Sequence, residues 1–269
     1  MPRDAWTLER FGLTPSKLWE RLVERQAPRV LCVSIPKAGT HLLERALCLH
    51  PQLYRKLLPT LTNSSLQRRD GIDGLLATVR PGQVIASHLR FDGAFPEAAD
   101  RRHVPVIFLV RDPRDLVISQ VNYVARRSDH RFNPLFAQTD GLRRKLELAI
   151  VGDREHGLRS VGERLEVYAG WLRSNALVVR FEDLVGPGGG GDADRQAETV
   201  RTIYRHIRLP VDEVFVSSLC GRLFSSDSPT FRRGAIGQWR DLFDDELGDL
   251  FERTAGDMMR AYGYGADEG

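Results

Sequence analysis

The sequence has no long hydrophobic run. No stretch approaches the roughly 20 consecutive apolar residues that a membrane-spanning helix requires. Charged residues are scattered through positions 1–10, where a secretory signal would have its apolar segment. We therefore expect a cytoplasmic protein without a membrane span.

Cysteine is scarce. Cys32, Cys48 and Cys220 are odd in number, far apart in the chain and without a C-x-x-C spacing. This pattern favours neither a disulfide framework nor a zinc site. We expect three reduced and mostly buried thiols, and no metal.

The chain also lacks a block of charge of one sign. Its 39 basic residues are interspersed with 36 acidic ones, and the net charge is only +3. A groove for nucleic acid therefore has little support, and we expect no nucleic-acid partner. Lysine is rare, since the basic residues are nearly all arginine. The lysines are Lys17, Lys37, Lys56 and Lys145.

The length and composition suit one domain. A chain of 269 residues with 42% hydrophobic content can bury one large core. We expect a single domain over residues 1–269, with its first 25 or so residues as a helical extension. The glycine-rich stretch at 186–194 is too permissive in backbone angle for regular structure, and we expect a flexible loop there.

Short apolar runs that are continuous rather than alternating are typical of buried parallel strands. Segments with a helical pattern separate them, which predicts an α/β fold with a central parallel sheet flanked by helices. The expected strands are 29–35, 83–87, 104–110 and 176–180. The expected helices are 42–49, 116–125, 158–172 and 195–207.

The first expected strand ends in a loop, Pro36 to His41, that is followed at once by a helix. Backbone N–H groups at a helix N-terminus favour an anion. Gly39 permits close approach of the backbone, Thr40 offers a hydroxyl, and Lys37 supplies a mobile charge. The alternative is a plain turn with a solvated lysine. The loop is not a Walker loop, because Lys37 precedes the glycine.

The most apolar run, 104–110, ends in Arg111, where a nucleotide triphosphatase would have an aspartate for Mg²⁺. Arg111 and Ser119 can converge on one anion, and the guanidinium fork suits phosphate. A nucleotide with a second, separate phosphate would explain both anion sites. In the alternative, residues 111–115 form a local cluster of ion pairs in which Asp115 is the N-cap of the next helix.

Two further segments have residues suited to chemistry. His88 follows the strand at 83–87, and a histidine there can act as a general base, although a single histidine is more often a satisfied polar residue. Residues 231–240 combine adjacent arginines, two glycines and aromatic residues. They suit a loop that closes over an anionic nucleotide, or a basic surface turn in which Trp239 is anchored in the core.

Taken in order, these segments resemble the sulfotransferases that use 3'-phosphoadenosine 5'-phosphosulfate. The family patterns run P-K-S-G-T-T-W, K-[ST]-H-L-P, R-N-P-x-D-x-x-V-S, Y-E-D and F-R-K-G-x-x-G-D-W, and the match extends from about Val30 to Trp239. The resemblance implies a three-layer fold akin to P-loop kinases. It also implies that 3'-phosphoadenosine 5'-phosphosulfate is the donor substrate and that no metal takes part.

The resemblance also implies roles. The catalytic residues would be His88 as base, with Lys37 and Ser119, where Ser119 would hold Lys37 away from the donor until an acceptor arrives. The residues that would bind the nucleotide are Lys37, Ala38, Gly39, Thr40, His41 and Leu42 for the 5'-phosphosulfate, Arg111, Ser119, Arg232, Arg233 and Gly234 for the 3'-phosphate, and Phe181 beside the adenine.

The chain departs from the family pattern at three informative positions. Leu42 replaces a tryptophan that often stacks near the adenine, Ala86 replaces a lysine that assists the base, and Gln238 replaces an aspartate. These departures concern the details of the site rather than the reaction class. Because Ala86 carries no charge, Lys37 and Arg90 are the cations expected near the transferring group.

The acceptor is not evident from the sequence, and we expect a hydroxyl of a small molecule or a carbohydrate. Two other functions stay open at this point. One is an ATP- and Mg²⁺-dependent P-loop phosphotransferase, and the other is a nucleotide-binding protein without catalysis. The oligomeric state is also open.

Overall fold

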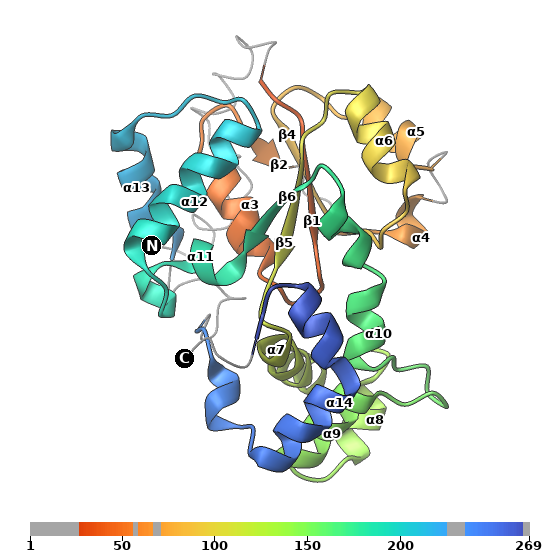
Figure 1. Ribbon diagram of the computed structural model, residues 1–269. Helices are drawn as coiled ribbons and strands as arrows, with labels where there is room; N and C mark the ends of the chain where they lie inside the picture. Colours follow the sequence, from red (N-terminus) through yellow and green to blue (C-terminus); the bar gives the residue numbers. More distant parts are fainter. Residues whose placement is uncertain (1–26, 56–58, 67–70, 225–234, 266–269) are drawn as a thin grey trace. The chain divides into compact units, whose positions relative to one another are not determined.

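The structure is a computed structural model that describes residues 27–55, 59–66, 71–224 and 235–265. It divides into two compact units (Figure 1). Unit 1 contains residues 1–110 and 171–236, and unit 2 contains residues 111–170 and 237–269. The expected N-terminal helical extension lies outside the described residues.

Unit 1 is built on a parallel sheet. Its strand order is β2-β4-β1-β5-β6, and β3 pairs with β4. All pairings in this sheet are parallel, so the carboxyl ends of β1, β4 and β5 lie at one edge. The strands are β1 (Val30–Ser34), β2 (Tyr54–Arg55), β3 (Leu61–Thr62), β4 (Gln83–His88), β5 (Val106–Val110) and β6 (Leu177–Arg180).

Helices cover both faces of the sheet of unit 1, which gives three layers (Figure 1). One face is covered by α3 (Thr40–Cys48), α11 (Phe181–Val185), α12 (Ala193–His206) and α13 (Glu213–Leu223). The other is covered by α4 (Asn63–Leu66), α5 (Gly71–Ala77) and α6 (Ala94–Arg101). Short 3-10 helices occur at η1 (Ala169–Arg173) and η2 (Pro187–Gly189).

The core of unit 1 lies along its central strands. Every residue of β1 and β5 is buried, as expected for strands covered on both faces. Trp171 is fully buried beside Phe108, and its indole N–H donates to the backbone oxygen of Leu89 at 2.9 Å. This bond fixes the segment that follows β4.

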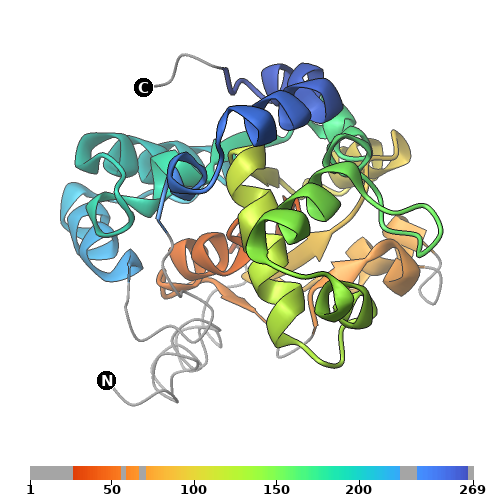
Figure 2. The same ribbon diagram turned by 90° about the horizontal axis from the view of Figure 1, so that it is seen from below.

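Unit 2 is helical among its described residues (Figure 2). Helix α7 packs against α8 and α9, and α14 packs against α9 and α10. The helices are α7 (Pro113–Arg126), α8 (Asn133–Gln138), α9 (Leu142–Val151), α10 (Val161–Glu166) and α14 (Asp245–Ala261), with the 3-10 helix η3 (Gln238–Asp241) before α14.

The four predicted strands are confirmed, as is the α/β class with a parallel sheet. The prediction of one helix over 158–172 is wrong. A capping box at Ser160 starts α10 at Val161, and the helix ends at Glu166 before η1 begins. The glycine-rich stretch was expected to lack regular structure, but it contains the 3-10 turn η2, in which the N–H of Gly189 donates to the oxygen of Gly186.

Candidate active site

A tight turn leads from β1 into α3. The N–H of Ala38 donates to the oxygen of Ile35 at 3.0 Å, which closes a four-residue turn with Pro36 in its second position. Lys37 occupies the third position with a φ of 77°. These features are those of a type II turn, which favours proline and then a residue of positive φ, usually glycine.

Lys37 is therefore strained. The left-handed region costs an ordinary L-residue roughly 1–2 kcal/mol. A glycine would take this position without that cost. Backbone strain of this kind is concentrated at functional sites.

The N-terminus of α3 suits an anion. Its first turn contains no acidic residue, so no carboxylate within that turn repels a bound anion. Gly39 is the N-cap, with a φ of 104°. A Cβ at this position would lie 2.5 Å from Cδ2 of Phe181, so the backbone at Gly39 lies against the Phe181 ring. Only glycine fits both the dihedral angle and the contact.

His88 lies beside this turn because β1 and β4 are neighbours. Its Nδ1 is 2.8 Å from the backbone oxygen of Ser34, the last residue of β1. A carbonyl oxygen can only accept, so Nδ1 carries the proton and donates it, and Nε2 is the basic nitrogen. Burial lowers the pKa of His88, which favours the neutral imidazole at neutral pH.

Ser34 also connects His88 to α3. Its Oγ lies 2.7 Å from Oγ1 of Thr40 and 3.3 Å from Nδ1 of His88. The first residue of α3 and the histidine at the end of β4 are therefore linked through one buried serine. Sequence reasoning did not single out Ser34, although a polar residue that ends an apolar strand was the available signal.

His41 is oriented by Glu44, one turn further along α3. Its Nδ1 lies 3.0 Å from Oε2 of Glu44, whose side chain is completely buried. The second carboxylate oxygen of Glu44 lies 2.6 Å from Nη1 of Arg55, which balances the buried charge. The imidazole of His41 therefore has a fixed position at the start of α3.

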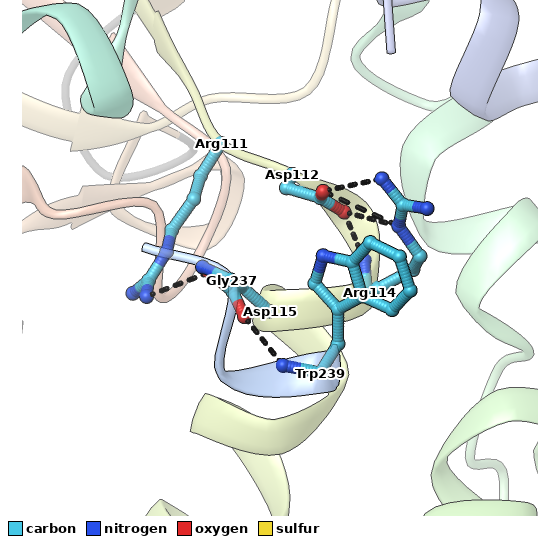
Figure 3. A network of polar contacts seen from close by, with 6 residues as sticks. All are labelled: Arg111, Asp112, Arg114, Asp115, Gly237 and Trp239. Atoms are coloured by element: carbon cyan, nitrogen blue, oxygen red, sulfur yellow. Dashed lines mark hydrogen bonds and ion pairs between the residues drawn. The ribbon is translucent and has the colours of Figure 1, made fainter. Parts of the chain in front are cut away.

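In unit 2, Asp112 and Arg114 form the N-terminus of α7 (Figure 3). Asp112 is the N-cap and accepts from the N–H of Arg114 at 2.8 Å, and Pro113 starts the helix. The Asp112 carboxylate also binds the Arg114 guanidinium, at 2.7 Å to Nη2 and 3.0 Å to Nε. The prediction that Asp115 caps this helix is wrong, because the helix starts at Pro113, three residues before the start that a cap at Asp115 would give.

Asp115 instead binds Arg111 and the segment before α14. Its Oδ2 lies 3.4 Å from Nη2 of Arg111 and accepts from the N–H of Gly237 at 2.9 Å, and its Oδ1 accepts from the N–H of Trp239 at 3.2 Å (Figure 3). Arg111 and Asp115 are both buried. The arginine predicted for phosphate binding is thus held by a buried carboxylate that sequence reasoning had assigned to capping.

Trp239 contacts two guanidinium groups. The carbon Cζ of Arg114 is 3.6 Å from the indole centroid, and that of Arg240 is 4.8 Å away. The buried indole Nε1 has no hydrogen-bond partner among the described residues. Trp239 is half-buried, and it is held by stacking and by its backbone N–H. This position does not distinguish a loop that closes over a nucleotide from a surface turn anchored by Trp239.

The predicted site residues fall into three groups. Unit 1 brings together the turn at Lys37, the start of α3, His88 and Phe181, whereas unit 2 contains Arg111 and Ser119 on or before α7. Leu42 and Ala38 are buried, and their backbone N–H groups donate to the oxygens of Gly39 and Ile35. Arg232, Arg233 and Gly234 lie outside the described residues. Within the described ranges, His, Cys, Asp and Glu side chains form no group of three that could hold a metal.

A model of the sulfotransferase domain matches residues 27–186, which is more than half of the chain. The chain belongs to the sulfotransferase family. It is an enzyme of the class that depends on 3'-phosphoadenosine 5'-phosphosulfate, as the sequence motifs indicated. No curated protein sequence matches this sulfotransferase.

Solved structures similar to this sulfotransferase include mouse sulfotransferase SULT7A1 complexed with PAP, at 18% identity and a TM-score of 0.62, with 96% of this chain and 94% of that chain covered. Retinol dehydratase in a complex with retinol and PAP has 17% identity and a TM-score of 0.55, with coverage of 97% and 95%. Its complex with androsterone and inactive cofactor PAP has 16% identity and a TM-score of 0.53, with coverage of 96% and 94%. At these identities the likeness shows the shared fold.

In the described parts of the chain, no helix of the sulfotransferase is both long enough and apolar enough to cross a lipid bilayer.

Proposed function

We propose that this sulfotransferase moves a sulfuryl group from 3'-phosphoadenosine 5'-phosphosulfate to a hydroxyl of a small-molecule or carbohydrate acceptor. The observation that carries the proposal is the link between His88 and the start of α3. Ser34 bonds to both His88 and Thr40, so a basic nitrogen and an anion-binding helix N-terminus occupy one end of the sheet.

In this proposal the start of α3 binds the 5'-phosphosulfate of the donor. The backbone N–H groups of Gly39, Thr40 and His41 and the hydroxyl of Thr40 donate to it, and Lys37 supplies the full charge. Phe181, whose ring lies against Gly39, forms an apolar wall beside the turn. Arg111 and Ser119 bind the 3'-phosphate, and Arg232, Arg233 and Gly234 are assigned to that phosphate by their motif alone.

His88 acts as the base. With its Nδ1 proton donated to Ser34, the Nε2 atom accepts the proton of the acceptor hydroxyl. The acceptor oxygen forms its bond to sulfur while the bond from sulfur to the 5'-phosphate oxygen breaks. Lys37 and the N–H groups of α3 stabilise the negative charge that builds on that leaving oxygen, and their positions are set before the reaction.

Support for the acceptor class comes from two of the similar structures. The retinol dehydratase structures contain retinol or androsterone, which are small molecules with a hydroxyl, and this favours a small-molecule acceptor.

We also propose that the reaction takes place in the cytoplasm. The three cysteines are thiols, as proteins of a reducing compartment require.

Nucleotide binding tests the donor assignment. Adenosine 3',5'-bisphosphate at 100 times its Kd should stabilise the folded enzyme by about 2.7 kcal/mol, and AMP at the same concentration should stabilise it much less. Thermal shift measures both, with ATP and Mg²⁺ as the comparison. Equal stabilisation by ATP and Mg²⁺ would instead favour a phosphotransferase.

Catalysis is then tested with labelled donor and a panel of acceptors that contains sterols, retinoids, phenols and sugars. Transfer of label to one class identifies the acceptor. If the nucleotide binds but no acceptor in any class is labelled, the proposed acceptor class is wrong.

A further inference from the structure

The carboxylate of Asp115 joins distant parts of unit 2. It is almost completely buried, and it accepts backbone N–H groups from Gly237 and Trp239, which are 122 and 124 residues further along the chain (Figure 3). The same carboxylate contacts the guanidinium of Arg111. One side chain therefore sets the positions of an arginine and of the turn that leads into η3.

The two buried ion pairs at this end of α7 differ in geometry. Arg114 binds both oxygens of Asp112 through Nε and Nη2, at distances from 2.7 to 3.2 Å. Arg111 meets Asp115 through Nη2, at 3.4 Å. The Arg114–Asp112 pair is thus bidentate, whereas the 3.4 Å contact of Arg111 with Asp115 involves a single guanidinium nitrogen.

Charge explains why the two side chains depend on each other. Burial raises the pKa of the Asp115 carboxyl, and the Arg111 guanidinium together with the N–H of Gly237 opposes that rise. Arg111, which is also buried, needs a nearby negative charge when no phosphate is bound. Asp115 supplies that charge from a fixed position.

We propose that Asp115 is a positioning residue for recognition of the donor's 3'-phosphate. It holds the guanidinium of Arg111 and the Gly237–Trp239 turn in one arrangement, so that the planar fork of Arg111 is oriented before the nucleotide binds. This inference rests on the proposed function, which assigns Arg111 to the 3'-phosphate. Asp115 does not touch the nucleotide and acts through Arg111.

The test compares two nucleotides that differ only in the 3'-phosphate. Calorimetry gives the Kd for AMP and the Kd for adenosine 3',5'-bisphosphate. The ratio of the first value to the second measures recognition of that phosphate. In Asp115→Ala the ratio should fall at least about tenfold, since a positioned charged contact is worth roughly 1.5–3 kcal/mol. Asp115→Asn keeps the size of the side chain and one acceptor oxygen, so its ratio should lie between the ratios of wild type and Asp115→Ala.

Two control variants separate positioning from stability. Asp244→Ala removes the N-cap of α14 in the same unit and leaves the Asp115 contacts intact, so it should lower the Tm and leave the ratio unchanged. In an Arg111→Ala background, Asp115→Asn should no longer change the ratio, because the residue through which it acts is absent.

Each outcome is informative. A wild-type ratio near one would count against the proposed function itself. A large wild-type ratio that Asp115→Asn and Asp115→Ala both retain would overturn the role of Asp115. Should Asp115→Ala fail to fold, the isosteric Asp115→Asn decides by the same ratio.

Discussion

At the scale of single residues, the mechanism proposed for unit 1 depends on the tautomer of His88. The residue type and its place after an apolar run were evident from the sequence, and so was the strand that carries it. The sequence does not show that the neighbouring strand ends in Ser34, whose carbonyl oxygen accepts from Nδ1 and leaves Nε2 as the basic nitrogen. The partner is 54 residues away, so only the pairing of β1 with β4 reveals it.

The tautomer and burial of His88 predict the pH dependence of the reaction. Burial lowers the folded-state pKa of His88 below its ordinary value of 6.5, so the neutral base persists at pH values where an exposed histidine is already protonated. The acid limb of kcat/KM should therefore have its midpoint below pH 6.5. A profile of kcat/KM for the donor against pH measures it, and a midpoint at or above 6.5 would contradict this environment for the base.

At the scale of elements, the agreement between sequence and structure follows apolar continuity. The central strands β1, β4 and β5 are continuous apolar runs and were predicted nearly to the residue. The two-residue strands β2 and β3 are too short to produce a pattern and were missed. Capping residues set where two helices begin: Ser160 caps α10, and Asp112 caps α7 in the role expected of Asp115.

The turn that joins β1 to α3 gives a prediction about stability. Lys37→Gly and Lys37→Ala lose the same charge, but only glycine relieves the φ of 77°. The strain exceeds the extra entropy that glycine gains on unfolding, so Lys37→Gly should be more stable than Lys37→Ala by about 0.5–1 kcal/mol. Urea unfolding of the two variants measures the difference.

Activity provides the control for this pair. Both variants lack the ammonium group and should lose sulfate transfer to a similar extent, whatever their stability. If Lys37→Gly is no more stable than Lys37→Ala, the left-handed conformation at this turn is not strained.

At the scale of the whole molecule, the sequence indicated the family and the class of sheet but not how segments far apart in the chain meet. The order β2-β4-β1-β5-β6 places β4 and β5 on either side of β1, which puts His88 beside the turn of Lys37. In unit 2, the contact of Asp115 with Gly237 and Trp239 spans 122 to 124 residues. Neither arrangement has a local sequence signal, because each is produced by tertiary packing.

The central claim is that His88 is the base of a sulfuryl transfer. The measurement that tests it most directly is the single-turnover rate of label transfer from saturating donor to the best acceptor of the panel, in wild type, His88→Ala and His206→Ala. His206 is a matched control because it also bonds to a backbone oxygen, that of Val106, and burial lowers its pKa as well.

Loss of a positioned base lowers a rate by roughly 10²- to 10⁴-fold. We predict a loss of that size in His88→Ala, with the affinity for adenosine 3',5'-bisphosphate retained and the rate of His206→Ala unchanged. Transfer at the wild-type rate in His88→Ala would contradict the assignment of His88 and, with it, the mechanism proposed for this site.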